Sequence, residues 1–505
     1  MRRHRQKDFE TSTGLFFTRA DATSTKIGWE ATIRKNFQHK IIALVLLILA
    51  CALAIAFQRM AEGHRVIPVE AYMLAPFVLL LLAIATVPFI SSASWERYYP
   101  HVSFTLAAVV VVYYIFVLNN GPRMCVTAVD YFSFMAITGS LFVVSGGILI
   151  RIPQGATPFS NTLMLLIGSI ITAVFSNTGA SMILIRPYLR MNKGRLSAYH
   201  VVFFIFTVSN IGGLLTPVGP PLFLGYLKGV PFFWVTEHLW LIWALETALV
   251  LAVFYLMDRH FYNKAKHTRA PVVKRIKERI SVVGWRHSIF IVVILLAVFL
   301  ETPLREIVMI AAGFFSYIVM KEEIHKENEF NFIPVKEVGI LFFGIFATMV
   351  PVLDWLELNA GKIGLTEPGQ FYWASGILSS FLDNAPTYLN FLSAACGLHG
   401  LSVDNVAHVK AMLGLLPVDE AATLQIAADA PRLLNNLSWK YVAATAAGSA
   451  TFGACTYIGN GPNFMVKSIA EQANVKMPSF FGYMIKYSIP ILIPIFTLVW
   501  YLFYH

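Results

Sequence analysis

The chain has 505 residues, of which 57% are hydrophobic and 13% charged, whereas soluble globular proteins carry roughly 25% charged residues. This composition excludes a soluble multidomain enzyme. The net charge of +11 fits either a nucleic-acid binder or a membrane protein with basic cytoplasmic loops, and the four scattered cysteines without a CxxC pair support neither a disulfide framework nor a zinc site.

The N-terminal part combines a basic segment with an apolar one. Residues 1–40 carry nine Lys or Arg and are too long and too charged to begin a cleaved signal peptide. The apolar residues 41–58 then predict a first membrane-spanning helix. Further uninterrupted spans are predicted at residues 71–91, 101–118, 130–150, 232–257, 285–300, 305–320, 338–353 and 483–503.

Four other apolar segments are interrupted by glycine, proline and polar residues. These are residues 157–190, 199–227, 369–396 and 439–466. An α-helix does not continue through such interruptions, and backbone groups freed at membrane depth need protein or a polar cavity as partners. We expect two of the segments, 157–190 and 369–396, to be re-entrant hairpins and the other two to be broken spans.

The distribution of basic residues predicts the topology. If residues 157–190 crossed the membrane, the four basic residues at 186–195 and the nine at 259–286 would lie outside, against the positive-inside rule. A hairpin that enters and leaves from the cytoplasm places them all inside. The chain is then an integral membrane protein with a cytoplasmic N-terminus and an outer C-terminus, the positive charge reflects topology, and nucleic acid is not an expected partner.

The predicted fold is an all-α polytopic membrane protein with 11 spans and two hairpins. One extra N-terminal span precedes an inverted repeat, in which residues 71–257 and 287–505 each contain five spans and one hairpin. A basic cytoplasmic loop, 258–286, separates the repeats, and the second repeat carries an outer insertion at 397–438 in which residues 403–416 predict a surface helix. Local sequence agrees, because Gly213 and Thr216 lie 240 residues before Gly453 and Thr456, and Asn177 lies 206 before Asp383.

Broken helices that meet at the membrane midplane bring free amides and carbonyls to one place. Hydroxyl, amide and carboxylate oxygens surround the expected meeting point, and these are the ligands that a hard cation such as Na⁺ prefers. Helix packing and satisfaction of broken backbone are the alternative roles for the neutral residues. The candidate ion- or substrate-binding residues are Ser176, Asn177, Thr178, Ser181, Asn210, Thr216, Asp383, Asn384, Thr387, Thr456 and Asn460.

Two acidic residues within apolar segments are candidates for proton coupling. Asp383 is also the candidate metal ligand for Na⁺, because one carboxylate that accepts either H⁺ or Na⁺ would couple their movements. Its alternative role is to cap a half-helix. Glu246 is either a second proton carrier or a structural carboxylate. No cofactor is expected beyond transported Na⁺ and H⁺.

The motifs Ser176-Asn177-Thr178, Asn210-Ile211-Gly212-Gly213, Thr216-Pro217-Val218-Gly219 and Leu382-Asp383-Asn384-Ala385-Pro386-Thr387 resemble those of the ion transporter superfamily. This superfamily includes NhaD-type sodium/proton antiporters, arsenite permeases and citrate or dicarboxylate carriers. The resemblance implies a homodimer in the lipid bilayer and elevator-like movement of the hairpins and broken spans. The acidic Asp383 is more similar to the antiporter and arsenite branches.

The leading functional prediction is therefore Na⁺/H⁺ antiport by alternating access. A cation-coupled carrier of citrate or another carboxylate, which would bind at the half-helix N-termini, is the alternative. An intramembrane enzyme is disfavoured because the chain has neither an HExxH nor a GxSxG motif.

Overall fold

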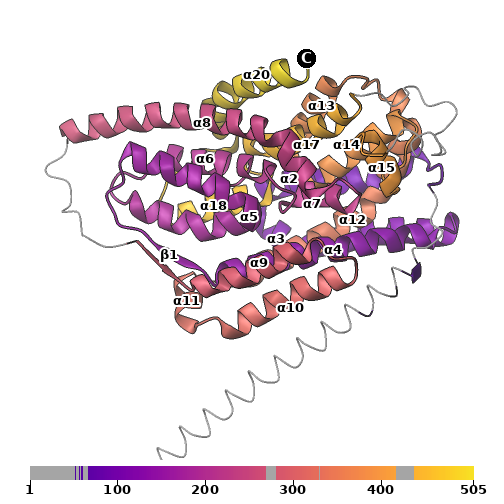
Figure 1. Ribbon diagram of the computed structural model, residues 1–505, viewed down its shortest axis with the longest axis horizontal. Helices are drawn as coiled ribbons and strands as arrows, with labels where there is room; N and C mark the ends of the chain where they lie inside the picture. Colours follow the sequence, from indigo (N-terminus) through magenta and orange to yellow (C-terminus); the bar gives the residue numbers. More distant parts are fainter. Residues whose placement is uncertain are drawn as a thin grey trace, which may run out of the picture. The chain divides into compact units, whose positions relative to one another are not determined.

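The computed structural model describes residues 66–268, 280–328, 330–416 and 437–505, with four isolated positions before residue 66. The basic segment 1–40 and the predicted span 41–58 lie outside these described residues. Residues 54–505 form one compact unit (Figure 1), in which we distinguish two groups of helices, one that contains the four interrupted segments and one that does not.

The first group, here called the support group, packs around two long helices, α4 and α12. Both are apolar along most of their length; the charged residues of α4 lie in its first half, and those of α12 lie near its two ends. The members of the group are η1 (Ala71–Leu74), α2 (Ala75–Ile90), α3 (Ser92–Val112), η2 (Tyr113–Val117), α4 (Gly121–Gly146), η4 (Trp285–His287), α9 (Ser288–Ala297), α10 (Leu304–Val319), α11 (Glu322–Glu327) and α12 (Ile333–Asn359).

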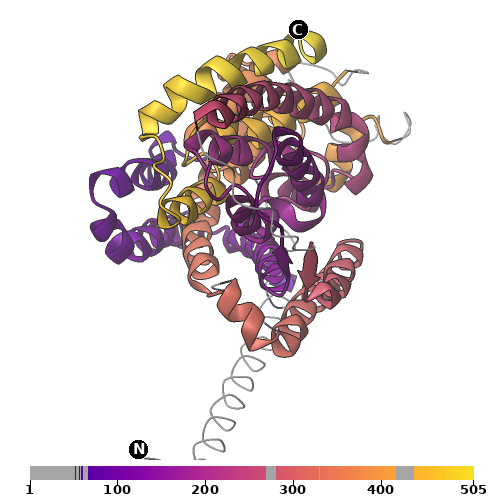
Figure 2. The same cartoon turned by 90° about the vertical axis from the view of Figure 1, so that its left-hand side faces the viewer.

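The second group, the hairpin group, contains all four interrupted segments. Its outer edge is formed by α8 and α20, which lie side by side (Figure 2). The members are α5 (Pro158–Met191), α6 (Ala198–Thr207), η3 (Ile211–Leu214), α7 (Pro220–Leu227), α8 (Phe232–Thr268), η5 (Ala360–Lys362), α13 (Pro368–Phe381), α14 (Asn384–Leu398), α15 (Val406–Met412), α17 (Trp439–Thr451), η6 (Phe452–Cys455), α18 (Gly461–Gln472), α19 (Phe480–Tyr483), η7 (Met484–Leu492) and α20 (Ile493–Phe503).

Both predicted hairpins double back. A straight helix with the 34 residues of α5 would be about 50 Å long, yet the Ala156 amide donates to the Met191 carbonyl at 3.0 Å. The start of the hairpin therefore meets its end. In the second hairpin, α13 and α14 pack together and the Phe371 and Phe391 rings lie 6.2 Å apart.

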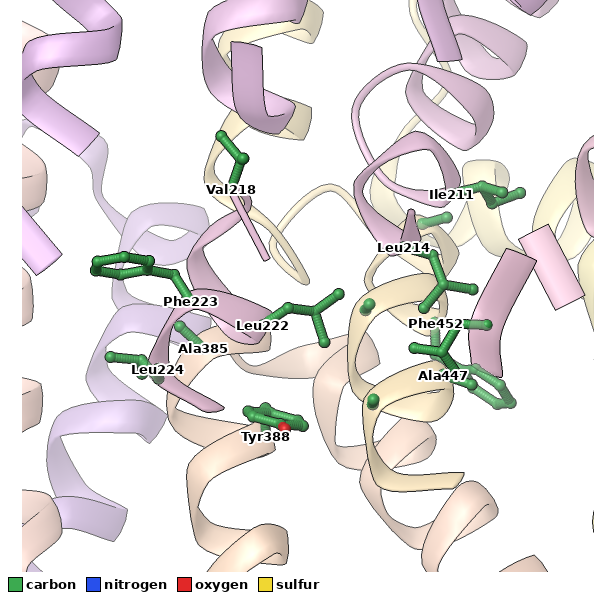
Figure 3. Packing of buried hydrophobic residues seen from close by; sticks show 14 of the residues in the cluster. Ile211, Leu214, Val218, Leu222, Phe223, Leu224, Ala385, Tyr388, Ala447 and Phe452 are labelled. Carbon is green, nitrogen blue, oxygen red and sulfur yellow. The ribbon is translucent and has the colours of Figure 1, made fainter. Parts of the chain in front are cut away.

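Each hairpin packs against a broken segment from the other half of the sequence. Helix α7 of the first half packs against α14 of the second, with Leu222 and Phe223 beside Ala385 and Tyr388 (Figure 3). Gly225 permits this close approach, because a Cβ there would overlap the Tyr388 ring. In the same way α18 packs against α5.

Seven helices of the described chain are long and apolar enough to cross a membrane, and shorter apolar helices occupy Ala198–Leu214 and Trp285–Ala297. Several predicted bounds are wrong. Helix α4 begins nine residues before the predicted span 130–150, because its Arg123 is buried in an ion pair with Asp354. Polar helix-forming residues extend α8 to Thr268, so the predicted loop 258–286 begins as helix. The helix expected at 403–416 is shorter, Val406–Met412.

The expectation of an all-α chain also requires a correction. Two short strands, β1 (Leu149–Arg151) and β2 (Ser281–Val283), pair antiparallel, with Ile150 opposite Val282. The strands lie in the segments that follow α4 and α8, and their branched side chains favour extended backbone. A helix-by-helix sequence analysis does not detect such a short pairing.

Candidate functional site

The tip of the first hairpin is strained. Ser176 has φ 62° and ψ 168°, a region that only glycine adopts readily and that costs other residues about 1–3 kcal/mol. This single residue interrupts α5 and frees the amides that follow it. At the second tip, Asp383 has ordinary extended backbone and caps α14, with its carboxylate accepting a hydrogen bond from the Ala385 amide at 3.1 Å.

Each hairpin is tied to its neighbouring broken segment by the same side-chain types. The Asn177 amide donates to the carbonyls of Ser209 (2.8 Å) and Asn210 (3.3 Å), and the Asn384 amide donates to Ala450 (3.2 Å). The Thr216 hydroxyl donates to the Ala173 carbonyl, and the Thr456 hydroxyl donates to the Ser380 carbonyl.

These matching contacts correct the pairing drawn from the sequence. Asn177 corresponds to Asn384, and therefore Ser176, not Asn177, corresponds to Asp383. Glycines confirm the match, since a Cβ on Gly213 would overlap the Asn177 amide and a Cβ on Gly453 would overlap the Asn384 amide.

Three asparagines join the two broken segments to each other. The Asn210 amide donates to the Asn463 side-chain oxygen at 2.7 Å, and the Asn460 amide donates to the Asn210 side-chain oxygen at 3.1 Å. All three side chains are buried. This network satisfies the broken backbone as well, because Asn463 also donates to the Gly453 and Thr456 carbonyls at 2.8 and 2.9 Å.

A small cavity of about 50 Å³ lies between the hairpin tips and the support group. Four half-helix N-termini reach it: Thr178 near the start of the second half of α5, Pro220 of α7, the Asp383 cap of α14, and Gly461 of α18. Helices α4 and α12 close the opposite side with mostly apolar residues. The full lining is Phe134, Met135, Thr138, Phe142, Thr178, Pro220, Val335, Val338, Phe342, Asp383, Asn460, Gly461 and Pro462.

The electrostatics of the cavity come from backbone and one carboxylate. Helix N-termini carry partial positive charge and attract anions, and no lysine or arginine is among the lining residues. Asp383 places a negative charge among these N-termini. The cavity volume holds a few waters or a small ion, so a larger solute requires the support group to move away.

The predicted site residues separate into two sets. Thr178, Asp383 and Asn460 line the cavity. The others contribute to the ties around it: Asn177, Asn210, Thr216, Asn384 and Thr456 make the contacts described above, Ser176 forms the kink, Ser181 bonds Ser209 at 2.8 Å, and Thr387 donates to the Asp383 carbonyl at 3.0 Å.

Glu246 lies away from the cavity. It is fully buried on α8, and neither carboxylate oxygen has a hydrogen-bond partner within the described chain. The Thr451 hydroxyl lies beside the Glu246 carboxyl group and donates to the Ala447 carbonyl at 2.9 Å. Glu246 is therefore not a ligand of the cavity in this arrangement.

The sequence analysis did not predict that α4 and α12 form an apolar wall of the cavity, or that the N-termini of α7 and α18 reach it. The Gly219-Pro220 and Gly461-Pro462 pairs are typical of helix starts and could have identified α7 and α18 as contributors. Phe134, Thr138 and Phe342 carry no such signal, because they lie within regular apolar helices.

A protein-family model described as "putative citrate transport" matches residues 66–504. The match includes both helix groups and all the cavity-lining residues. No curated protein matches the chain.

Proposed function

The chain belongs to the citrate-transport family of that model, and we propose that it carries citrate or a related carboxylate across the membrane, coupled to H⁺ or Na⁺. Membership in a transporter family, together with the apolar helices, makes it an integral membrane transport protein. The identity of the substrate and of the coupling ion is what we propose beyond this.

The convergence of four half-helix N-termini on one cavity carries this proposal. A carboxylate binds where several free amides point, but Asp383 would repel it while ionised. Protonation of Asp383, or a cation bound to it, removes that repulsion. Coupled transport follows, because the carboxylate binds well only when the proton or cation is also present.

The proposed architecture has 11 spans, an inverted repeat with two re-entrant hairpins, a cytoplasmic N-terminus and a homodimer that works by elevator-like alternating access. Ion-pair positions support the topology, since paired residues fall on the same predicted side: Lys228 with Asp404 outside, and Arg195 with Asp258 inside. Matching ties at the two hairpins support the repeat.

Na⁺/H⁺ antiport is the second candidate, and the size of the cavity favours it. About 50 Å³ suits a small ion with a few waters, and Asp383, Thr178 and Asn460 supply oxygen ligands without any rearrangement. In this alternative, H⁺ and Na⁺ compete for the Asp383 carboxylate.

Solute-dependent proton flux in proteoliposomes tests both candidates. Na⁺, Li⁺, K⁺, citrate and arsenite are supplied in parallel, and citrate uptake driven by an H⁺ or Na⁺ gradient is the expected result. Na⁺-dependent proton flux without citrate uptake would replace the carboxylate carrier with the antiporter.

Two matched substitutions locate the coupling group. Asp383→Asn keeps the size and the capping ability of the side chain but cannot exchange a proton, so coupled flux should be lost while the protein still folds. Glu246→Gln removes a buried carboxylate that does not line the cavity and should leave coupling intact. The opposite pattern would assign coupling to Glu246.

A further inference from the structure

Five side chains of alternating charge join the support group to the hairpin group at one end of the helices. Arg123 and Asp130 belong to α4 and Asp354 to α12, whereas Lys228 follows α7 and Asp404 follows α14. Consecutive members form ion pairs: Asp354 with Arg123 at 2.9 Å, Arg123 with Asp404 at 3.1 Å, Asp404 with Lys228 at 2.7 Å, and Lys228 with Asp130 at 2.5 Å.

Two of these four pairs cross between the groups, and both are shielded from water. The side chains of Arg123 and Asp404 are 1% and 2% exposed, and those of Lys228 and Asp130 are 7% and 17% exposed. Burial by itself would lower the pKa of the Lys228 ammonium, but Asp130 and Asp404 hold it above its ordinary value. Lys228 therefore stays charged, and its burial is tolerated only while its partners remain in place.

Three other ion pairs among the described residues each join side chains of a single group. Arg195 pairs with Asp258 inside the hairpin group, Arg305 with Glu306 inside the support group, and Lys467 with Glu471 along α18. The Arg123–Asp404 and Lys228–Asp130 pairs, by contrast, can form only when the two groups are arranged as they are in this structure.

We propose that the network of Arg123, Asp130, Asp354, Lys228 and Asp404 is an ionic latch that holds the hairpin group in the position seen here. The latch rests on the alternating-access function proposed above. When the hairpin group moves, the Arg123–Asp404 and Lys228–Asp130 pairs break while Arg123–Asp354 and Lys228–Asp404 travel intact with their own groups. Lys228 and Asp404 therefore act as positioning residues for transport, because they set how often the cavity opens without touching the solute.

Distance measurement between two exposed labels tests the latch without altering it. Spin labels are attached to cysteines at Tyr98 on α3 and Leu415 after α15, both exposed, in full-length protein whose four native cysteines are replaced by alanine. Double electron–electron resonance is recorded in liposomes with and without citrate or Na⁺. The latch predicts two distances, whose populations change at least tenfold in Lys228→Gln. If that variant is not monodisperse, Asp404→Asn, which keeps the side-chain size, provides the same comparison.

Arg151→Gln is the matched control. It removes the exposed Arg151–Glu327 pair, which joins β1 to α11 and includes no residue of the hairpin group or of the network, and should leave the distances unchanged. A single distance under all conditions, or the same populations in the Lys228 and Arg151 variants, would overturn the latch. Flux measured on the same samples separates the two proposals: two distances without any citrate or Na⁺ flux refute the transport function alone, whereas flux with a single distance refutes the latch alone.

Discussion

Replacing Gly213 by alanine tests the tie between the first hairpin and its broken segment. A Cβ at this position would overlap the Asn177 side-chain oxygen and lie 2.8 Å from its Cγ and Nδ2. Asn177 must then leave its place and give up its hydrogen bonds to the Ser209 and Asn210 carbonyls.

The expected loss of stability follows from those bonds. Two hydrogen bonds contribute about 0.5–1.5 kcal/mol each, and a buried amide left without partners costs about 1–3 kcal/mol more. The smaller entropy of an unfolded alanine chain offsets about 0.4–1 kcal/mol. Gly213→Ala should therefore lower the free energy of unfolding by about 3 kcal/mol, within a range of about 1–6 kcal/mol, measured by denaturant titration in detergent.

A double-mutant cycle identifies the cause. Because Asn177→Ala removes the obstructing side chain, adding Gly213→Ala to it should cost almost nothing. At Gly453 the same pair of substitutions should behave differently. Asn384→Ala should not rescue Gly453→Ala, because the new Cβ would also lie 2.8 Å from the Gly459 carbonyl oxygen, and that backbone atom stays in place. Gly461→Ala, whose Cβ meets no atom within 4 Å, is the control. Additive losses at Gly213 and Asn177 would refute the reasoning.

Three further predictions concern the cavity and the topology. Gly461→Ala should fold normally but place a methyl group at the cavity wall, raising the apparent KM for the transported solute; an unchanged KM would remove Gly461 from the site. Thr178→Val keeps the side-chain shape and should weaken the apparent affinity for the transported solute about tenfold, or about 1.4 kcal/mol. An unchanged affinity would show that the Thr178 hydroxyl does not bind the solute. Cysteines at the exposed Arg190 and Asn405 should react with an impermeant reagent only from the cytoplasmic and outer side, respectively, and reversed labelling would contradict the proposed hairpin topology.

The sequence predicted the interruptions well, because glycine, proline and polar residues inside an apolar segment have few structural explanations. The Ser176 kink and the Asp383 cap both lie where those signals placed a hairpin tip. It was much harder to predict from the sequence which of the polar residues line the cavity. Asn177 and Thr178 are adjacent and both polar, yet one ties the backbone and the other faces the cavity, a difference that depends on the three-dimensional path after the kink.

Charged residues caused the errors in helix bounds. Arg123 and Asp354 look like the ends of membrane helices when each is considered alone, whereas together they neutralise one another and allow α4 and α12 to continue. Their sequence separation of 231 residues hides this partnership from any local pattern. The small sheet was missed for the same reason, since its strands are joined only in space.

That sheet bears on how the two groups can move. The chain passes between the groups three times in its described order: from α4 to α5, from α8 to α9, and from α12 to α13. β1 lies in the first passage and β2 in the second, and their pairing fastens the two passages together beside α9. Any displacement of the hairpin group must therefore carry these two passages together as one unit, whereas the third passage, from α12 to α13, follows Asp354 at the other end of the helices, close to the ion pairs of Arg123.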